Sequence, residues 1–578
     1  MTMEMRLRRV SSLALLALAL PLCGNAQSPP AAASAASPPP IVAPAPGSST
    51  GVIAPQPPPP DDPAAQAIYA RIAAMAPIQG GPLTRREAAI GQALSDFYTQ
   101  RHFSPAWAEA DNVDQLFTGL GSVEADGLLP QDYGLDALRN IWQAPGFKDA
   151  TPEQHADFDL MATRAYMTAL VQLARGKVDP TRLDPVWNID PLAIDPQQGL
   201  AMLETSIDQH SVGQAFAQAR PQNPLYGKLR DGLAQLRATA SNGEWPGVPD
   251  GPSLKPGMQD PRVTALRARL VAGGYLDAAL NHGQHYDTAV TEAVKRFQQD
   301  HYLDVDGAVG TDTLAALNVP VAQRIGQVRA NLERARWLLH ALPGTFVVVD
   351  VAGFKVAYYR DGNPVWKSRV QVGKPYRSTP IFRSDITYIT FNPTWTIPPT
   401  ILKNDVLPKI RANPAYLANN RIRVLDSAGN TIPATGVNWS NPRGITLRQD
   451  AGAGNSLGQV VIRFPNSFAV YLHDTPHQEL FSKAKRDTSS GCIRVEHPLD
   501  LVQLLFNDDE KWNRDAIDAR IATGKTQNVT LPTSVPILLA YWTVDIDDEG
   551  RLGFKNDIYG RDAPLLAALD KPQVMKPL

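Results

Sequence analysis

The chain reads Tyr471-Leu472-His473-Asp474-Thr475-Pro476 and, a little further on, Ser489-Ser490-Gly491-Cys492-Ile493-Arg494-Val495. A thiol nucleophile needs a nearby base or cation that holds it as the thiolate. It also needs backbone N–H groups that stabilise an oxyanion, and glycine lets them approach closely. Because His473 ends an apolar run typical of a strand, we expect it to be the base for Cys492, with Gly491 beside the oxyanion.

Two other histidines lie in the same region, and each offers an alternative. His477 follows Pro476 and is expected in a turn, and His497 precedes a proline and is expected to cap the next helix. Zinc ligation by His473, His477 and Cys492 is a further alternative. Pro476 disrupts the helix that would align the two histidines, and no CxxC or HExxH spacing occurs. The sequence therefore predicts neither a metal nor a cofactor.

Composition places the chain among ordinary multidomain proteins. It has 578 residues, too many for one core, and a formal net charge of -2, which gives no reason to expect a nucleic-acid partner. Only two cysteines occur, Cys23 and Cys492. If Cys23 is removed with a leader, the mature protein keeps one thiol and forms no internal disulfide. A buried free cysteine is the alternative to a catalytic one.

The N-terminus has the pattern of a secretory signal peptide, residues 1–26. Arginines within residues 6–9 precede the apolar run Val10–Leu22, and Gly24-Asn25-Ala26 offers small residues for cleavage. A lipoprotein acylated at Cys23 is the alternative, although Leu22 stands where a small residue is expected. No later run approaches the ~20 apolar residues of a membrane span. We therefore expect a periplasmic protein without a membrane span.

The rest of the chain divides by composition into further segments. Helical spacing marks Ala65–Met75, Thr84–Arg101 and Leu160–Arg175. From Phe346 onward, β-branched and aromatic runs separated by turn residues indicate strands. The fold class is therefore multidomain α and β. We expect a Pro/Ala-rich linker at 27–64, a helical scaffold at 65–250, a small module at 258–319, a β-rich domain at 344–545 and a C-terminal segment at 546–578.

The small module has three short helical patterns separated by glycine turns. It carries Leu266, Leu270, Gly274-Tyr275, Phe297 and Asp306-Gly307 in that order. In this it resembles peptidoglycan-binding domain 1, a three-helix module. Such a module implies peptidoglycan as a partner. A structural bundle that no longer binds glycan is the alternative.

An insertion interrupts the β-rich domain between about 393 and 421. Its helical segment, Ile401–Ile410, is flanked by Pro398-Pro399 and Pro414. An insertion of this size beside a site is a natural lid. Trp395 at its start is expected either to close over substrate or to belong to the core.

His-Asp-Thr followed by Ser-x-Gly-Cys-x-Arg resembles the signature of the L,D-transpeptidase catalytic domain over residues 344–545. Gly373 and Thr379-Pro380 match an early part of the family pattern, while Ser490 stands where many members have histidine. The larger Gram-negative members are similar to this chain in carrying serine there. They also resemble it in having an inserted lid and in the order of signal, scaffold with embedded wall-binding module and catalytic domain.

The resemblance implies a cysteine L,D-transpeptidase that forms 3→3 peptidoglycan crosslinks through a thioester on Cys492. The imidazole of His473 would be oriented by a backbone carbonyl near Asp474. Tyr471 and Ser490 would be pocket walls, and Arg494 would meet a stem carboxylate or brace the loop. Peptidoglycan stems would be donor and acceptor, other cell-wall synthesis proteins would be candidate partners, and carbapenems would acylate the thiol.

Three alternatives to crosslinking stay open from the sequence. With water as acceptor the same site is an L,D-carboxypeptidase, and with a lipoprotein amine it is an anchoring transpeptidase. A non-catalytic peptidoglycan-binding scaffold with a dead site is the third. The pairing of His473 with Cys492 favours an enzyme over this last alternative.

Overall fold

The computed structural model describes residues 60–75, 85–184, 187–340 and 342–573. The expected signal peptide, Cys23 and nearly all of the expected linker lie outside these ranges. Within them, no helix combines the length and the apolar character that crossing a membrane requires.

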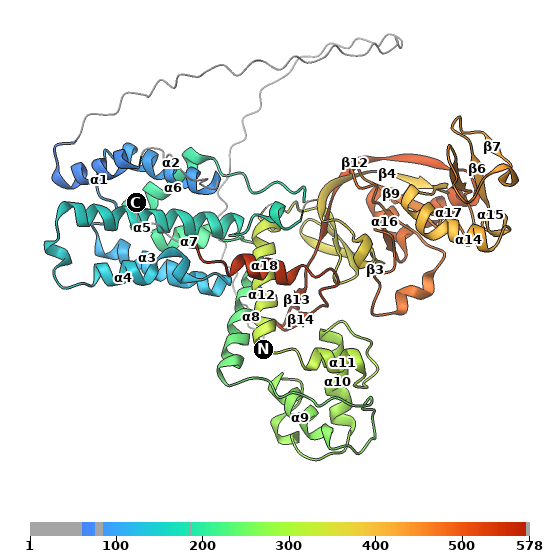
Figure 1. Cartoon of the computed structure of the whole chain (residues 1–578), viewed down its shortest axis with the longest axis horizontal. Coiled ribbons are helices and arrows are strands. Elements are labelled where there is room, and N and C mark those ends of the chain that lie inside the picture. The colour runs from blue at the N-terminus through green and yellow to red at the C-terminus, as the bar shows by residue number, and fades with distance from the viewer. Residues whose placement is uncertain (1–59, 76–84, 185–186, 341, 574–578) are drawn as a thin grey trace, which may run out of the picture. The chain divides into compact units, whose positions relative to one another are not determined.

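The N-terminal part is a helical scaffold, as the periodicity predicted (Figure 1). Its longest helix, α5, begins at the N-cap Thr151, whose hydroxyl and Gln154 form a capping box, and ends at Gly176, where φ is 84°. Most of the other helices pack around it through one apolar core, whereas the last, Pro224–Ser241, buries its apolar side in a second core. The scaffold helices are α1 (Pro63–Ala74), α2 (Arg85–Gln100), α3 (Ala110–Ser122), α4 (Leu135–Trp142), α5 (Pro152–Arg175), α6 (Pro196–Asp208), α7 (Val212–Ala219) and α8 (Pro224–Ser241).

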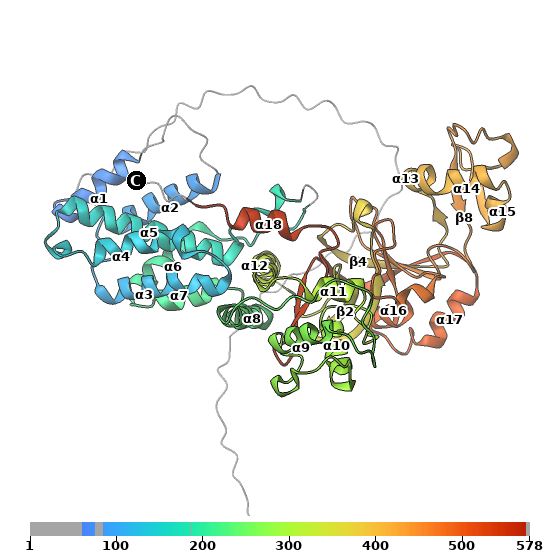
Figure 2. The same cartoon turned by 60° about the horizontal axis from the view of Figure 1, so that its bottom comes forward.

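The small module contains the three predicted helices, α9 (Arg262–Ala272), α10 (Thr288–Asp300) and α11 (Thr311–Leu317). They bury a core of their own that includes Leu266 and Phe297. The next helix, α12 (Val321–Leu338), lies along α8 in both views of the molecule (Figures 1 and 2).

The β-rich domain is a closed barrel in the order β1-β12-β4-β9-β10-β11-β3-β2. The inner faces of its strands form one apolar core. Most neighbours are antiparallel, but β10 pairs with β11, and β1 with β12, in parallel. The strands are β1 (Phe346–Asp350), β2 (Lys355–Arg360), β3 (Asn363–Gln371), β4 (Phe382–Phe391), β9 (Val460–Arg463), β10 (Leu472–His473), β11 (Ile493–Val495) and β12 (Gln527–Ala540), with α16 (Pro498–Phe506) and α17 (Arg514–Ala522) between β11 and β12.

The insertion is larger than the expected helical stretch 393–421. A four-stranded sheet β5-β8-β6-β7, whose first strand precedes the helical part and whose other strands follow it, extends the insertion to Gln449, and the insertion has its own apolar core. These strands have two to four residues each, too short for alternation to predict. The elements are β5 (Trp395–Thr396), α13 (Pro399–Ile401), a π-helical turn (Leu402–Val406), α14 (Leu407–Ala412), α15 (Tyr416–Asn419), β6 (Ile422–Leu425), β7 (Thr431–Ile432) and β8 (Thr446–Gln449).

The C-terminal segment returns to the scaffold. The hairpin β13 (Val544–Ile546) and β14 (Leu552–Phe554) crosses the expected boundary at 545, and α18 (Asp562–Leu569) follows. The carbonyl of Leu569 accepts a hydrogen bond from Lys177 at 2.6 Å, and Asp570 pairs with Arg329. The segment is therefore part of the folded body.

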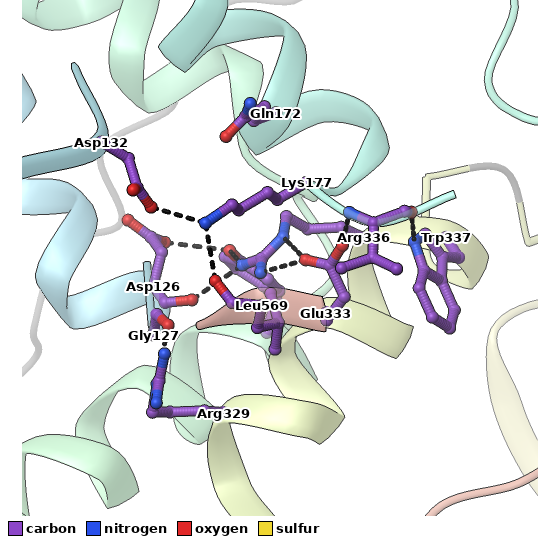
Figure 3. A network of polar contacts seen from close by, with 12 residues as sticks. Asp126, Gly127, Asp132, Gln172, Lys177, Arg329, Glu333, Arg336, Trp337 and Leu569 are labelled. Atoms are coloured by element: carbon purple, nitrogen blue, oxygen red, sulfur yellow. Dashed lines mark hydrogen bonds and ion pairs between the residues drawn. The ribbon is translucent and has the colours of Figure 1, made fainter. Parts of the chain in front are cut away.

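A buried polar network joins α12 to the scaffold (Figure 3). The guanidinium of Arg336 donates to the Glu333 carboxylate and, at 2.8 Å, to the carbonyl of Asp126. Glu333 also accepts from the Val178 N–H at 2.6 Å. Arg336 and Glu333 side chains have no solvent exposure. Since buried charges are costly unless they are paired, each partner depends on the other.

Glu333→Ala should therefore lower stability by about 3–5 kcal/mol, because it leaves the Arg336 charge buried without its carboxylate. Denaturant unfolding followed by circular dichroism measures the loss. Glu292→Ala is the matched control, since it removes an i,i+3 pair with Lys295 that is exposed, and exposed pairs contribute less than ~1 kcal/mol. Equal effects of the two substitutions would contradict the role of the network.

Candidate active site

The register between β10 and β11 places the predicted residues on one face. Leu472 pairs with Ile493 and His473 with Arg494, and the Ile493 N–H donates to the Tyr471 carbonyl at 3.1 Å. Side chains alternate along a strand, and Leu472 and Ile493 are buried in the barrel core. Tyr471, His473 and Arg494 therefore share the opposite face, together with Cys492, which lies two residues before Arg494.

The thiol of Cys492 is partly exposed and lies 3.7 Å from the carbonyl oxygen of Ala469. Burial desolvates the thiol and thereby raises its pKa. Hydrogen bonds from Tyr471 and the positive charges of Arg463 and Arg494 act in the opposite direction. With the pKa above its usual range, the thiol is protonated near neutral pH and needs a base when it reacts.

His473 is buried, and its ring nitrogen Nδ1 lies 2.5 Å from the backbone carbonyl of Asp474. Burial, helped by the charge of Arg494, lowers the pKa of the imidazole to about 3, although the carbonyls of Asp474 and Leu457 oppose the shift. The ring is therefore neutral. With Nδ1–H donating to Asp474, Nε2 is left with a lone pair for a proton.

The carboxylate of Asp474 points elsewhere. It accepts hydrogen bonds from the Gln459 N–H at 2.8 Å and from the Gln478 side chain at 3.2 Å. The imidazole is thus oriented by a carbonyl rather than by a carboxylate, which agrees with the expectation drawn from the family resemblance.

The loop before the thiol is held by its own hydrogen bonds. The Gly491 N–H donates to the Ser489 hydroxyl at 3.1 Å, and that hydroxyl donates to the Cys492 carbonyl at 2.6 Å. Gly491 has φ of 115°, which favours glycine. Because its N–H is already engaged, Gly491 is less available for an oxyanion than we expected, and the Cys492 N–H is the better candidate.

Three residues outside the expected site brace this loop. A Cβ on Gly373 would lie 3.0 Å from the Gly491 Cα and closer still to the Arg377 carbonyl, so only glycine fits. The Thr379 hydroxyl donates to the Gly491 carbonyl at 2.9 Å. Tyr559, from the C-terminal segment, donates to the Gly373 carbonyl at 2.7 Å. Gly373 and Thr379 were identified through the family pattern, whereas no sequence signal marked Tyr559.

Arg463 on β9 is a further member of this face that we did not predict. Its guanidinium lies 4.5 Å from the centre of the Tyr471 ring. Arg494 donates weakly to Gln371 at 3.3 Å. Among the described residues, the Nε atoms of Arg463 and Arg494 are buried without a hydrogen-bond partner. Each cation therefore keeps a buried donor that no described protein group satisfies, and no local pattern marked Arg463, because Val460, Val461 and Ile462 are all buried.

Ser490 lines an open pocket of about 540 Å³ beside the thiol loop. Its hydroxyl accepts a hydrogen bond from Arg377 at 2.9 Å. Trp395, by contrast, pairs with Gln449 on β8 and packs on the insertion's apolar core, and it does not line this pocket. Trp395 thus contacts the apolar core of the insertion, and its expected closure over substrate stays a prediction.

Comparisons with protein families match three parts of the chain. Residues 92–233 match a scaffold domain, residues 259–317 a "Putative peptidoglycan binding domain", and residues 344–509 the L,D-transpeptidase catalytic domain. The last range includes every residue of the face described above.

One curated relative carries a description that agrees with the family match. A Haemophilus influenzae protein described as "Putative L,D-transpeptidase" is 34% identical over 235 residues, which are 40% of this chain and 47% of that protein. The chain thus spans about half the length of this curated relative.

Solved structures of L,D-transpeptidases from Mycobacterium smegmatis and Xylanimonas cellulosilytica are each 16% identical to this chain. The first covers 34% of this chain and 58% of its own, with a TM-score of 0.16; the second covers 50% and 99%, with a TM-score of 0.17. At such scores the structural likeness adds nothing to the assignment. Residues 344–509, which include His473 and Cys492, are thus similar to the L,D-transpeptidase catalytic domain, and they follow stretches similar to a scaffold domain and to a "Putative peptidoglycan binding domain".

Proposed function

We propose that the protein is a periplasmic L,D-transpeptidase that forms 3→3 peptidoglycan crosslinks through a thioester on Cys492. The observation that carries the proposal is the common face of His473 and Cys492, set by the β10–β11 register inside the matched catalytic domain. The predicted leader supports the periplasmic location, and the matched wall-binding module supports peptidoglycan as substrate.

In the first half-reaction, Nε2 of His473 takes the thiol proton while Sγ attacks the carbonyl of the third stem residue, a diaminopimelate. The new bond is C–S, and the bond that breaks joins this carbonyl to the terminal D-alanine, whose amine receives the proton. The Cys492 N–H is the oxyanion donor we favour. The lowered pKa of the imidazole leaves the ring unprotonated near neutral pH, so the Nε2 lone pair is free to take the thiol proton.

In the second half-reaction, the side-chain amine of another stem attacks the thioester. Its proton passes to His473, the C–S bond breaks, and the thiol is restored. Arg463 and Arg494 would stabilise a stem carboxylate through their positive charge, and Tyr471, which contacts both Arg463 and His473, would be the pocket wall. With water or a lipoprotein amine as acceptor, the same site is a carboxypeptidase or an anchoring enzyme.

Purified protein incubated with a tetrapeptide stem should gain an acyl group on Cys492 and release D-alanine, because the thiol displaces the terminal residue. Mass spectrometry of the Cys492 peptide measures the adduct. Cys492→Ala should show none. His473→Gln should slow acylation by about 10²–10⁴-fold, which is the usual contribution of a general base.

The products that the protein forms on isolated sacculi show which acceptor it uses. Crosslinked dimers would support the transpeptidase, whereas trimmed stems alone would favour the carboxypeptidase. If no adduct forms with stems or with a carbapenem, the non-catalytic scaffold is the better account.

The pH dependence of thiol alkylation tests the charge state of the pair. The pKa of Cys492 is raised by burial and that of His473 is about 3, so both groups are neutral between pH 5 and 8. Iodoacetamide should therefore react slowly at pH 6 and steadily faster as the pH rises through the thiol pKa. Quantification of the alkylated Cys492 peptide gives the profile.

Arg463→Gln should move this profile to higher pH, because it removes a positive charge that favours the thiolate. Arg423→Gln on the insertion is the matched control and should leave the profile unchanged. A rate plateau from pH 5 to 8 would instead mean a thiolate–imidazolium pair, in conflict with the neutral pair described here.

A further inference from the structure

The pocket beside the thiol loop lies where the insertion meets the barrel. From the barrel it is lined by Tyr376 and Arg377, in the turn Pro375–Arg377, and by Ser490. From the insertion it is lined by Thr400, Asn404 and Asp405. It is open and has room for a small polar group, and Ser490 places it two residues from Cys492.

The two charged residues of this pocket form a pair that uses only part of their hydrogen-bonding capacity. Nη1 of Arg377 donates to Oδ2 of Asp405 at 2.6 Å and to the Ser490 hydroxyl at 2.9 Å. Among the described residues, Nε and Nη2 of Arg377 and Oδ1 of Asp405 make no hydrogen bond to protein. The Arg377 side chain is only 17% exposed, so those donors are held in a nearly fixed place.

The backbone that carries Asp405 is unusual. Asp405 belongs to the π-helical turn Leu402–Val406 within the insertion. Such turns are rare and occur often at functional sites, because they redirect side chains that a regular helix would present elsewhere. The ring of Tyr376 is 71% exposed at the edge of the same pocket, where it is available for contact with a ligand's carbon chain.

We propose that Arg377 and Asp405 recognise an amino-acid zwitterion, an ammonium and a carboxylate on one carbon, at the far end of the donor's third residue. The Nε–Nη2 edge of Arg377 fits a carboxylate in bidentate fashion, and Oδ1 of Asp405 accepts from the ammonium. The four charges then alternate around the carbon. This inference rests on the proposed function and names the substrate feature that the pocket selects.

The short separation between Cys492 and the pocket is compatible with the length of this ligand. Ser490 and Cys492 are two residues apart, so their Cα atoms are separated by at most about 7 Å, and the bend at Gly491 shortens this separation. In diaminopimelate, the two amino-acid centres are separated by four carbon–carbon bonds of ~1.5 Å, or about 5 Å end to end. A donor with its carbonyl at Cys492 can therefore place its far end in the pocket.

The negative charge of Asp405 indicates that the pocket binds the donor stem rather than the acceptor stem. An ammonium held against a carboxylate stays protonated and has no lone pair with which to attack a thioester. The attacking amine of the acceptor must therefore come from elsewhere, while the unreactive far end of the donor gains orientation from the pair.

The test measures binding to the Cys492→Ala protein, which cannot turn over, by isothermal titration calorimetry. Three tetrapeptide stems are compared: one with a free far end, one with its far amine acetylated and one with its far carboxylate amidated. Each modification should weaken binding about tenfold, equivalent to about 1.4 kcal/mol. Asp405→Asn should remove the penalty for acetylation, and Arg377→Gln the penalty for amidation.

Asp450→Asn is the matched control, because Asp450 forms a similar ion pair with Arg423 on the insertion but does not line the pocket. It should leave both penalties intact. Three stems that bind equally would overturn the proposal. So would an Asp405→Asn protein that weakens all stems by the same factor, since the pair would then only hold the insertion in place.

Acylation of the wild-type thiol by the unmodified stem, followed in parallel, keeps the two proposals apart. Acylation without selectivity among the stems overturns the zwitterion site alone. Selective binding without any acylation contradicts the proposed function but still supports the recognition site.

Discussion

The parallel pairing of β10 with β11 is the constraint on which the site depends. With Leu472 opposite Ile493, both apolar side chains enter the barrel core and their polar neighbours emerge together on the other face. A slip of one residue would exchange the two sets and bury the imidazole in the core, at a large cost in lost apolar burial. The hydrophobic effect, acting on Leu472 and Ile493, therefore fixes the position of His473 relative to Cys492.

Burial also determines the charge states of His473 and Cys492. Low exposure holds the pKa of His473 near 3 and raises that of Cys492, so that neither group is charged at rest. No carboxylate takes part in orienting the ring, because the carbonyl of Asp474 does so. In the part of the chain that the structure describes, the Nε atoms of Arg463 and Arg494 have no hydrogen-bond partner. Such a face is suited to stabilising negative charge that arrives with a substrate or develops during its reaction.

Sequence reasoning identified this face where local pattern and family signature coincided. His473 at a strand end, Gly491-Cys492 in a turn, and the helical scaffold and module were all accessible from spacing. Arg463 and Tyr559 were not identified, because they reach the site through strand pairing and chain return that no local window contains. The sheet of the insertion was also missed, since strands as short as Trp395–Thr396 have no readable period. The role expected for the Gly491 N–H depended on a hydroxyl hydrogen bond that only coordinates reveal.

Support for the site extends well beyond the barrel. Tyr559 holds Gly373, and Gly373 in turn leaves just enough space for Gly491, so the thiol loop depends on the segment after β14. That segment continues into α18, whose end is bound by Lys177 of the scaffold, close to the buried pair of Glu333 and Arg336 (Figure 3). The thiol loop is thus held by contacts that come from outside it, from Thr379 and, through Gly373, from Tyr559. Because the segment that carries Tyr559 is itself bound to the scaffold, the scaffold contributes to the active-site geometry together with the barrel strands.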